Sequence, residues 1–429
     1  MKVYEEYKDS GAAEIEKIPQ SWSVAKLKRV CSFIYGNSLH TDIREEGRVP
    51  LYGSNGITGY HSQSITLAPC IIVGRKGSFG KINYSQVPCF PIDTTYFIDK
   101  SATNNNLRWL YYALQTLNLD GFSKDTGVPG LSREDAYNRD VPLPPIEEQH
   151  AIANFLDEKT AHIVTLVTKK KQLIELLKEE RIAIVNHAVT KGINPDAPMQ
   201  DSGIEWLGEV PAHWEVKKLK YVANTVQTGS TPPSESKEYY EEGVINWFAP
   251  SDFKDSIILE NSNRKITPLA IEKGVVKSFP PNSVYLIGIG ATLGKVGICN
   301  EAASCNQQLN VITFKPIINP YFGALYLSSI SKIIVSLANA ATLAILNQTQ
   351  TKDLIFVIPP KKEQEEIVNY IQLKQNTITS TILKIESEIN LLQEYRTAII
   401  SEAVTGKIDV RSHTSADHFF NPEILAYAE

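Results

Sequence analysis

The chain has 429 residues, 42% of them hydrophobic and 21% charged, which is close to the average of globular proteins and excludes wholesale disorder. This length exceeds one ordinary core and predicts two or three domains. No apolar run reaches the roughly 18 residues of a membrane span, so we expect a soluble, cytoplasmic protein without a membrane partner. Because the net charge is −5, binding to nucleic acid would require a local basic surface.

The spacing of cysteine and histidine argues against a metal site. The cysteines are odd in number and form no Cys-x-x-Cys motif, and no two histidines stand at metal-ligand spacing on a helix. We interpret the cysteines as buried free thiols and expect neither a metal nor a cofactor. The five cysteines are Cys31, Cys70, Cys89, Cys299 and Cys305.

In chain order, the first recognisable feature is a block at residues 10–28 that returns 192 positions later. A second block, at residues 144–181, returns 215 positions later, so the second copy carries 215 − 192 = 23 more residues between its blocks. A repeat of this length indicates duplicated domains rather than a solenoid. The repeated pairs include Pro19 with Pro211, Trp22 with Trp214, Lys26 with Lys218, Pro145 with Pro360, Glu148 with Glu363, Gln149 with Gln364 and Arg181 with Arg396.

Between the blocks lie two inserts that resemble each other little, apart from Gly74 and Gly80–Lys81 against Gly288 and Gly294–Lys295. Each insert mixes apolar strand-like runs with turns rich in Gly and Asn, which predicts an α+β domain with many loops. The predicted strands include residues 70–73, 95–98, 284–287 and 309–314.

Two long helices are predicted, from about residue 146 to 190 and at the equivalent place in the second copy. Apolar positions fall at spacings of three, four and seven, the pattern of a coiled-coil seam, and no Pro or Gly interrupts either segment. Each helix would be about 67 Å long. Two unrelated surface helices are the alternative, but a shared seam favours packing of one helix on the other. The seam runs through Ile152, Leu156, Ile163, Val167, Ile174, Leu177, Ile184 and Ala188, and through Ile367, Ile371, Ile378, Ile382, Ile389, Leu392, Ile399 and Ala403.

Gly-rich segments that follow predicted strands do not have the spacing of a phosphate-binding loop. In residues 286–296, Ile289 and Val296 stand where that loop needs Gly and Ser or Thr. Leu293 occupies a glycine position of the dinucleotide fingerprint. In the similar segment of the first copy, residues 74–81, Arg75 stands where the phosphate-binding loop needs Gly. A nucleotide cofactor site is therefore not expected.

Two further enzyme patterns are incomplete. A nuclease-like set of Asp196, Glu215 and Lys217 is divided between a linker and a repeat whose first copy has Ser23 in place of the glutamate. A DNA methyltransferase needs an Asn/Asp-Pro-Pro-aromatic motif, but residues 319–321 lack the second proline. We therefore expect a protein that is not an enzyme.

The duplicated motifs resemble the conserved regions of the specificity subunits of Type I restriction-modification systems. Each motif is modest alone, but their order and duplication cover nearly the whole chain, from about Ser10 to Asp409. The segments that carry the resemblance are residues 144–149, 188–192, 202–208 and 211–214, the copies at 359–364 and 403–407, and, within the inserts, residues 52–60, 74–77 and 229–232.

The resemblance implies a non-catalytic subunit that binds double-stranded DNA. It would assemble with two adenine-N6 methyltransferase subunits and, for restriction, with ATP-dependent translocase-nuclease subunits. Each target-recognition domain would read one half of a bipartite sequence, and the helices would form an antiparallel coiled coil within a pseudo-twofold α+β fold. The expected parts are a first recognition domain at 1–143, a central helix at 144–191, a linker and second recognition domain at 192–358, a C-terminal helix at 359–408 and a tail at 409–429.

Side chains that could contact bases are the Arg, Lys, Asn and Gln of the insert loops, because they offer directional donors to base edges. The same Asn and Gly residues are also ordinary turn formers, and that alternative stays open. The candidates are Asn55, His61, Arg75, Lys76, Lys81 and Lys124 in the first insert, and Ser230, Thr231, Lys295, Asn306, Gln307 and Gln308 in the second.

Two other functions are compatible with the domain pattern. A restriction enzyme fused to its reading domains would need a nuclease or methyltransferase motif, and none was found. A purely structural coiled-coil adaptor would fail to bind DNA when methyltransferase subunits are present.

Overall fold

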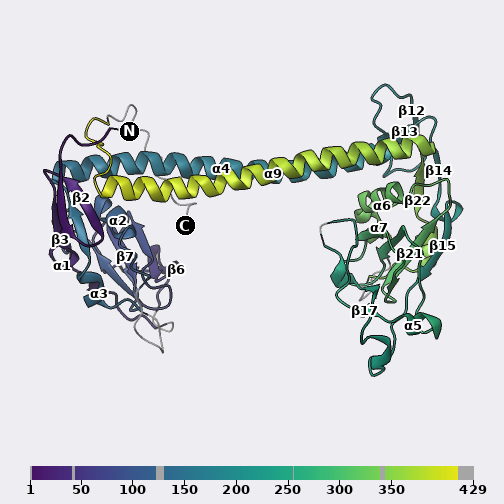
Figure 1. Ribbon diagram of the computed structural model, residues 1–429, viewed down its shortest axis with the longest axis horizontal. Coiled ribbons are helices and arrows are strands. Elements are labelled where there is room, and N and C mark those ends of the chain that lie inside the picture. The colour runs from purple at the N-terminus through teal and green to yellow at the C-terminus, as the bar shows by residue number, and fades with distance from the viewer. Residues whose placement is uncertain (1, 41–43, 122–129, 255, 339–343, 414–429) are drawn as a thin grey trace. The chain divides into compact units, whose positions relative to one another are not determined.

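The computed structural model divides into two compact units (Figure 1). Unit 1 is built from residues 1–172 and 385–429, and unit 2 from residues 173–384. Unit 1 therefore combines segments that are far apart in the sequence. The structure describes residues 2–40, 44–121, 130–254, 256–338 and 344–413.

The main sheet of unit 1 has the strand order β4-β10-β7-β8, and all neighbouring strands are antiparallel. Ile71 and Val73 of β7 belong to the large core beneath helix α2, whereas Cys70 and Ile72 pack with Tyr52 on the other face. Side chains alternate along a strand, so a continuous apolar run is explained by burial of both faces. The elements are β4 (Ile34–Tyr35), β10 (Thr95–Ile98), β7 (Cys70–Gly74), β8 (Ile82–Ser85) and α2 (Leu107–Gln115).

A second sheet of unit 1 has the order β6-β5-β9, in which β5 and β9 are parallel. A hairpin, β1–β2, and a ladder, β3–β11, complete the strands. These elements are β1 (Tyr7–Ala12), β2 (Ile15–Pro19), β3 (Ser23–Lys26), β5 (Val49–Gly53), β6 (Gly56–His61), β9 (Phe90–Pro91), β11 (Asp140–Leu143), α1 (Leu27–Val30) and α3 (Arg133–Tyr137).

Unit 2 has a main sheet of order β15-β21-β18-β19, again antiparallel throughout. Val284 and Leu286 pack in the core beneath helix α6, while Tyr285 and Ile287 pack on the opposite face with Phe248. A small sheet, β17-β16-β20, contains the parallel pair β16–β20. These elements are β15 (Ala223–Thr228), β21 (Leu309–Phe314), β18 (Ser283–Ile287), β19 (Val296–Cys299), β16 (Ile245–Phe248), β17 (Lys265–Ile266), β20 (Ser304–Cys305) and α6 (Pro320–Ser329).

The remaining elements of unit 2 are short. Two ladders, β12–β13 and β14–β22, correspond to the hairpin and the ladder of unit 1. The elements are β12 (Met199–Asp201), β13 (Glu209–Pro211), β14 (Glu215–Lys218), β22 (Ile355–Ile358), α5 (Pro268–Glu272), α7 (Ser331–Leu337), α8 (Gln348–Lys352), and 3-10 turns at Leu219–Tyr221, Lys237–Tyr239 and Pro250–Asp252.

The two inserts share one strand order although their sequences differ. The order β4-β10-β7-β8 matches β15-β21-β18-β19, and the sheet β6-β5-β9 matches β17-β16-β20, including its parallel pair. Apolar and β-branched residues replace one another freely in buried strands, so topology persists while identity is lost. The duplication therefore extends through the inserts, which the sequence comparison did not reveal.

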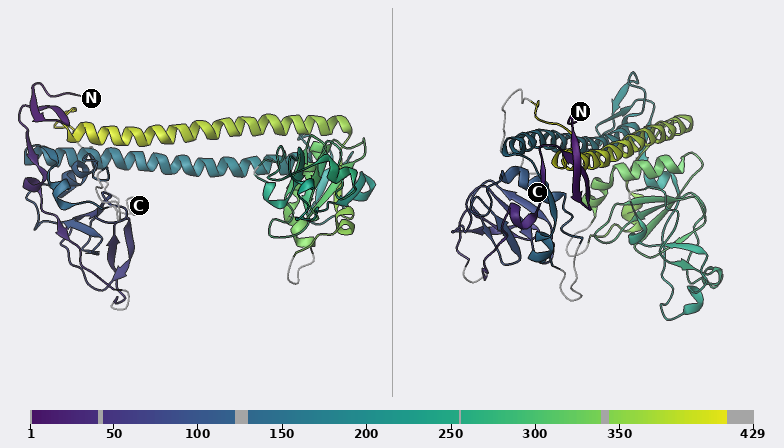
Figure 2. Two further views of the ribbon diagram at one scale, coloured as in Figure 1. Left: turned by 60° about the horizontal axis from the view of Figure 1, so that its bottom comes forward. Right: turned by 60° about the vertical axis from the view of Figure 1, so that its left-hand side comes forward.

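The two predicted long helices are present as α4 (Ile146–Lys191) and α9 (Lys361–Val404), which lie side by side (Figures 1 and 2). In unit 1, Ile152 near the start of α4 shares a core with Ile399 near the end of α9, and Lys170 pairs with Glu388 at 2.5 Å. In unit 2, the end of α4 shares a core with the start of α9. The helices are therefore antiparallel in each unit.

The repeated glutamine fixes each long helix to its own domain. Gln149 accepts a hydrogen bond from the backbone N–H of Asn106 (2.9 Å) and donates to the carbonyl of Pro144 (3.0 Å). Asn106 is the N-cap of α2. In unit 2, Gln364 makes the same pair of bonds, to the backbone N–H of Asn319 at 2.7 Å and the carbonyl of Pro359 at 2.8 Å. Because both glutamines are buried, these bonds satisfy groups that water cannot reach.

Shortly after the end of each long helix stands a glycine in the left-handed conformation, Gly192 with φ of 80° and Gly406 with φ of 75°. Gly406 lies against Pro19 and Trp22, and Gly192 lies against Trp214. The end of α9 therefore contacts the first block of the chain as the end of α4 contacts its copy. Of the expected tail, residues 409–413 are described, and the backbone N–H of Asp409 donates to the carbonyl of Lys2 (2.8 Å); residues 414–429 lie outside the described part.

In the part of the chain that the structure describes, no single helix is long and apolar enough to cross a membrane. Helices α6 and α7 have the length and composition of a membrane span only when they are counted together, and they are bent by 65° relative to each other. Six residues of α6 are buried in unit 2, as expected for a core helix.

Candidate nucleic-acid interface

Two hairpin turns of unit 1 bring two of the predicted contact residues together. Asn55 lies in the β5–β6 turn and Lys81 lies just before β8, and both are exposed. The Lys81 Nζ donates to the carbonyl oxygen (3.0 Å) and to the Oδ1 (3.2 Å) of Asn55. An exposed amide beside an exposed ammonium is suited to donate to bases or phosphates.

Arg75 forms a second basic cluster of unit 1. Its Nη1 donates to the carbonyl of Asp93 (3.0 Å), and its guanidinium carbon lies 5.1 Å from the ring centre of Tyr35. Arg133 lies 5.0 Å from the same ring, which is 45% exposed, and Lys76 is an exposed neighbour. Tyr35 and Arg133 were not found by sequence reasoning, because no local pattern connects a residue of β4 with one of α3.

His61 is placed in a different setting from the other candidates. Its ring is 5% exposed, packs edge-on against Phe90 at 5.4 Å, and its Nδ1 lies 3.3 Å from the backbone N–H of Glu45. These contacts favour a packing role over contact with a base. Lys124 lies outside the described residues.

In unit 2, the structure brings together the start of β21 and the segment that follows β15. The Thr231 hydroxyl donates to the Oε1 of Gln307 (2.5 Å), and both residues are exposed. Asn306 is buried and organises the turn: its Oδ1 accepts from the Gln308 backbone N–H (3.0 Å). The Ser230 hydroxyl donates to the carbonyl of Val275 (3.1 Å).

A cavity of about 410 Å³ adjoins this cluster. Gln307 and Gln308 line it together with Asn347, Gln348 and Thr349 of the α8 region. Side-chain amides present a donor and an acceptor at once, as readout of adenine requires. Sequence reasoning missed residues 347–349, which lie about 40 positions from Gln308 in the chain. Lys295 is exposed beside Gly294 and does not line this cavity.

All five cysteines are buried and free, which confirms the interpretation from their spacing. The Sγ atoms of Cys70 and Cys89 lie 3.4 Å apart. Among the residues that the structure describes, no group of three His, Cys, Asp or Glu side chains is arranged to hold a metal ion.

The described part of the chain thus combines duplicated α+β domains, amide and basic side chains on exposed turns, and paired long helices. The family model of the Type I restriction modification DNA specificity domain matches residues 19–176 and 211–391, which is most of the chain. The chain belongs to this family, and the resemblance seen in its motifs is confirmed.

Curated relatives agree with this assignment. The chain is 24% identical to the Type I restriction enzyme MjaIX specificity subunit of Methanocaldococcus jannaschii, over 92% of this chain and 96% of the relative. It is 23% identical to the EcoBI specificity subunit of Escherichia coli, over 83% of this chain and 76% of the relative. Membership of this family makes the chain a specificity subunit, which is not itself an enzyme, as the sequence predicted.

Solved structures show the same mixed α/β fold. The HsdS subunit from Thermoanaerobacter tengcongensis superposes with a TM-score of 0.57 at 17% identity, covering 91% of this chain and 98% of that subunit. A chain from a structure that describes complex assembly and conformational transition of the type I R-M system gives a TM-score of 0.60 at 16% identity, covering 91% and 99%.

Proposed function

We propose that this chain recognises a bipartite DNA sequence for a Type I restriction-modification complex, with unit 1 reading one half-site and unit 2 the other. The supporting observation is one strand order that carries two different sets of exposed side chains. Unit 1 presents Asn55 and Lys81, whereas unit 2 presents Thr231 and Gln307. A common frame with different contact residues is what two unlike half-sites require.

The partners in this proposal are two adenine-N6 methyltransferase subunits and, for restriction, translocase-nuclease subunits. Two exposed leucines support two copies of a partner. Leu176 of α4 is 61% exposed and Leu391 of α9 is 59% exposed, and 391 − 176 = 215, which is the offset of the second repeated block. Equivalent apolar side chains, one in each unit, are suitable for the same surface of two identical partners.

The finer architecture is also part of the proposal. Helices α4 and α9 form one antiparallel coiled coil that spaces the reading heads in a pseudo-twofold frame. The recognition domains are residues 1–143 and 192–358, the helices are 144–191 and 359–408, and residues 409–429 follow as a tail. The complex acts in the cytoplasm, where it has access to chromosomal DNA.

The test is an exchange of residues 20–140 for the same segment of another specificity subunit, in a host that supplies the methyltransferase subunits. Methylome sequencing is expected to show one new half-site and one unchanged half-site, because distant sites act independently. The corresponding exchange of residues 221–355, in the second unit, should change only the other half-site. A change in both halves after either exchange would contradict the proposal.

A further inference from the structure

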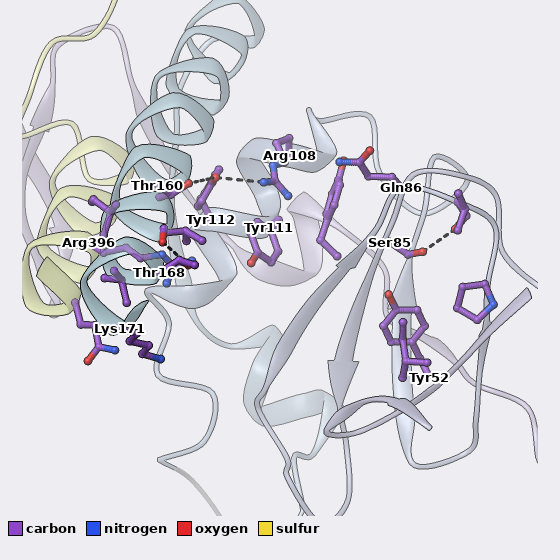
Figure 3. A pocket seen from close by; sticks show the side chains of 18 of the residues that line it. Tyr52, Ser85, Gln86, Arg108, Tyr111, Tyr112, Thr160, Thr168, Lys171 and Arg396 are labelled. Atoms are coloured by element: carbon purple, nitrogen blue, oxygen red, sulfur yellow. Dashed lines mark hydrogen bonds between the residues drawn. The ribbon is translucent and has the colours of Figure 1, made fainter. Parts of the chain in front are cut away.

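Unit 1 contains an open groove of about 800 Å³ between its reading domain and the long helices (Figure 3). One wall comes from the β5–β6 hairpin, β8 and α2, and the other from α4 and α9. Three basic side chains line it, Arg108, Lys171 and Arg396, and none of its described lining residues is Asp or Glu. In a chain with a net charge of −5, this is a local positive surface of the kind that binding to a polyanion requires.

Arg108 is a fixed part of the wall. Its guanidinium carbon lies 4.5 Å from the ring centre of Tyr84 and 5.1 Å from that of Tyr112, and its Nε donates to Asp157 at 2.6 Å. The Tyr112 hydroxyl donates to the same carboxylate at 2.6 Å, and burial raises the pKa of Tyr112 so that it keeps its proton. Asp157 is thus occupied by wall residues and does not neutralise the rest of the groove.

Lys171 and Arg396 are the available cations. Neither forms an ion pair within the described part of the chain, although the adjacent Lys170 pairs with Glu388. The Nε of Arg396 is buried and has no hydrogen-bond partner among the described residues. A buried donor without a partner is costly, and a change of rotamer that turns the guanidinium towards an anion in the groove would relieve this cost. Both side chains are drawn at the helix side of the groove in Figure 3.

The groove is lined by elements that also carry the proposed reading surface. Tyr52 and Tyr60 line it and belong to the hairpin whose turn carries Asn55. Tyr84 and Gln86 line it a few residues after Lys81. DNA that Asn55 and Lys81 contact would therefore bind to the same hairpin and strand that form one wall of the groove. Tyrosine hydroxyls and glutamine amides are common phosphate and sugar contacts.

We propose that this groove holds the sugar-phosphate backbone of the DNA beside the half-site read by unit 1, with Lys171 and Arg396 contacting phosphates. The contact positions the duplex and carries no sequence information. This inference rests on the proposed function, because it requires DNA on the reading surface. An acidic segment of a partner subunit is the competing occupant, and nothing on the adjoining hairpin turns favours it over DNA.

The experiment uses the full chain assembled with its methyltransferase subunits and a duplex that contains the mapped target. Target affinity is measured between 50 and 200 mM salt for the wild type, Lys171→Gln, Arg396→Gln, the double variant, and the matched control Lys169→Gln. Lys169 is an exposed lysine of α4 that does not line the groove. Each lost phosphate contact reduces the slope of log affinity against log salt by about 0.9, so the double variant should lose about 1.8.

Raising the salt from 50 to 200 mM should therefore weaken DNA binding by the double variant about tenfold less than DNA binding by the wild type. Its methylated sequence should stay unchanged, Lys169→Gln should keep the wild-type slope, and Arg396→Lys should keep most of it. A wild-type slope in the double variant, or a changed recognition sequence, overturns the inference. So does a defect in subunit assembly with an unchanged slope, which would assign the groove to a partner segment. A wild-type complex without preference for its target would instead refute the proposed function.

Discussion

Cys31 shows how a single buried side chain makes stability depend on pH. It lies in the core of unit 1, where burial raises the pKa of its thiol from 9.0 to about 12. Because the pKa in the folded state is above that in the unfolded state, the contribution to stability is complete below about pH 9 and is lost as the pH rises toward 12.

Between pH 8 and pH 10, this thiol should lower the free energy of unfolding by about 1.4 kcal/mol, since the unfolded chain ionises it and the folded chain does not. Urea denaturation at pH 8 and at pH 10 measures this difference. Between these pH values, the free energy of unfolding of Cys31→Ala should fall less than that of the wild type, by the amount given above. Val30→Ala, an adjacent buried position without a titratable group, is the control and should keep the full fall. Equal pH dependence in Cys31→Ala and the wild type would contradict the assignment.

At the level of residues, the structure places together some of the side chains that were predicted from the sequence, and their contact with bases stays a prediction. Asn55 with Lys81, and Thr231 with Gln307, were chosen as polar side chains in turns, and the structure places each pair in hydrogen-bond contact. Sequence reasoning did not find Tyr35, whose neighbours come from distant segments of the chain. Local patterns describe exposure and turn chemistry, whereas such clusters depend on which strands pair.

At the scale of elements, the two helix-ending glycines provide a matched comparison. Both have positive φ, so alanine at either position is strained by about 1 kcal/mol or slightly more. A Cβ at Gly406 would lie 2.5 Å from Pro19, whereas at Gly192 the nearest atoms are 3.4 Å away. Only the first substitution therefore adds a clash with the fold.

Gly406→Ala should lower the free energy of unfolding by about 2–4 kcal/mol, which sums the backbone strain and an overpacking cost. Gly192→Ala should cost only about 1–2 kcal/mol. Thermal or urea unfolding of the two variants, each against the wild type, measures the difference. Equal destabilisation would mean that Gly406 and Pro19 do not pack closely.

The long helices and several strands were predictable because their signals are local. The seam spacing gave both helices, and the apolar runs at 70–73 and 309–314 are β7 and β21. Strand order was not predictable, because β4 pairs with β10 across 60 residues of chain and β5 pairs in parallel with β9. Pairing partners are selected by the packing of whole faces, which a single sequence does not display.

At the scale of the molecule, the length of the proposed coiled coil sets the spacing between the two recognition domains, and thereby the gap between the two half-sites. An insertion of four residues near Ile174 lengthens α4 by about 6 Å, close to the rise of two base pairs. The gap between the half-sites should grow by one or two base pairs, or binding should fail if the heads no longer follow the groove. Both half-site sequences should stay the same.

Methylome sequencing of the insertion variant measures the gap directly. A four-residue insertion at about residue 197, between the end of α4 and β12, is the control and should leave the gap unaltered. Full activity with the original gap in the Ile174 variant would show that the helices do not set the spacing.

The two-segment construction of unit 1 has a consequence for how the protein is made. Its core includes Ile18 and Trp22 from the beginning of the chain and Ile399, Ala403 and Ile408 from near the end. Between the two segments lie the 212 residues of unit 2, from 173 to 384, which a ribosome adds in about 10–40 s at 5–20 residues per second. Unit 2 is continuous and can close as it emerges. Unit 1 cannot complete its core until its second segment has been synthesised, and part of its apolar surface stays exposed until then. Its dependence on chaperones during synthesis should therefore exceed that of unit 2.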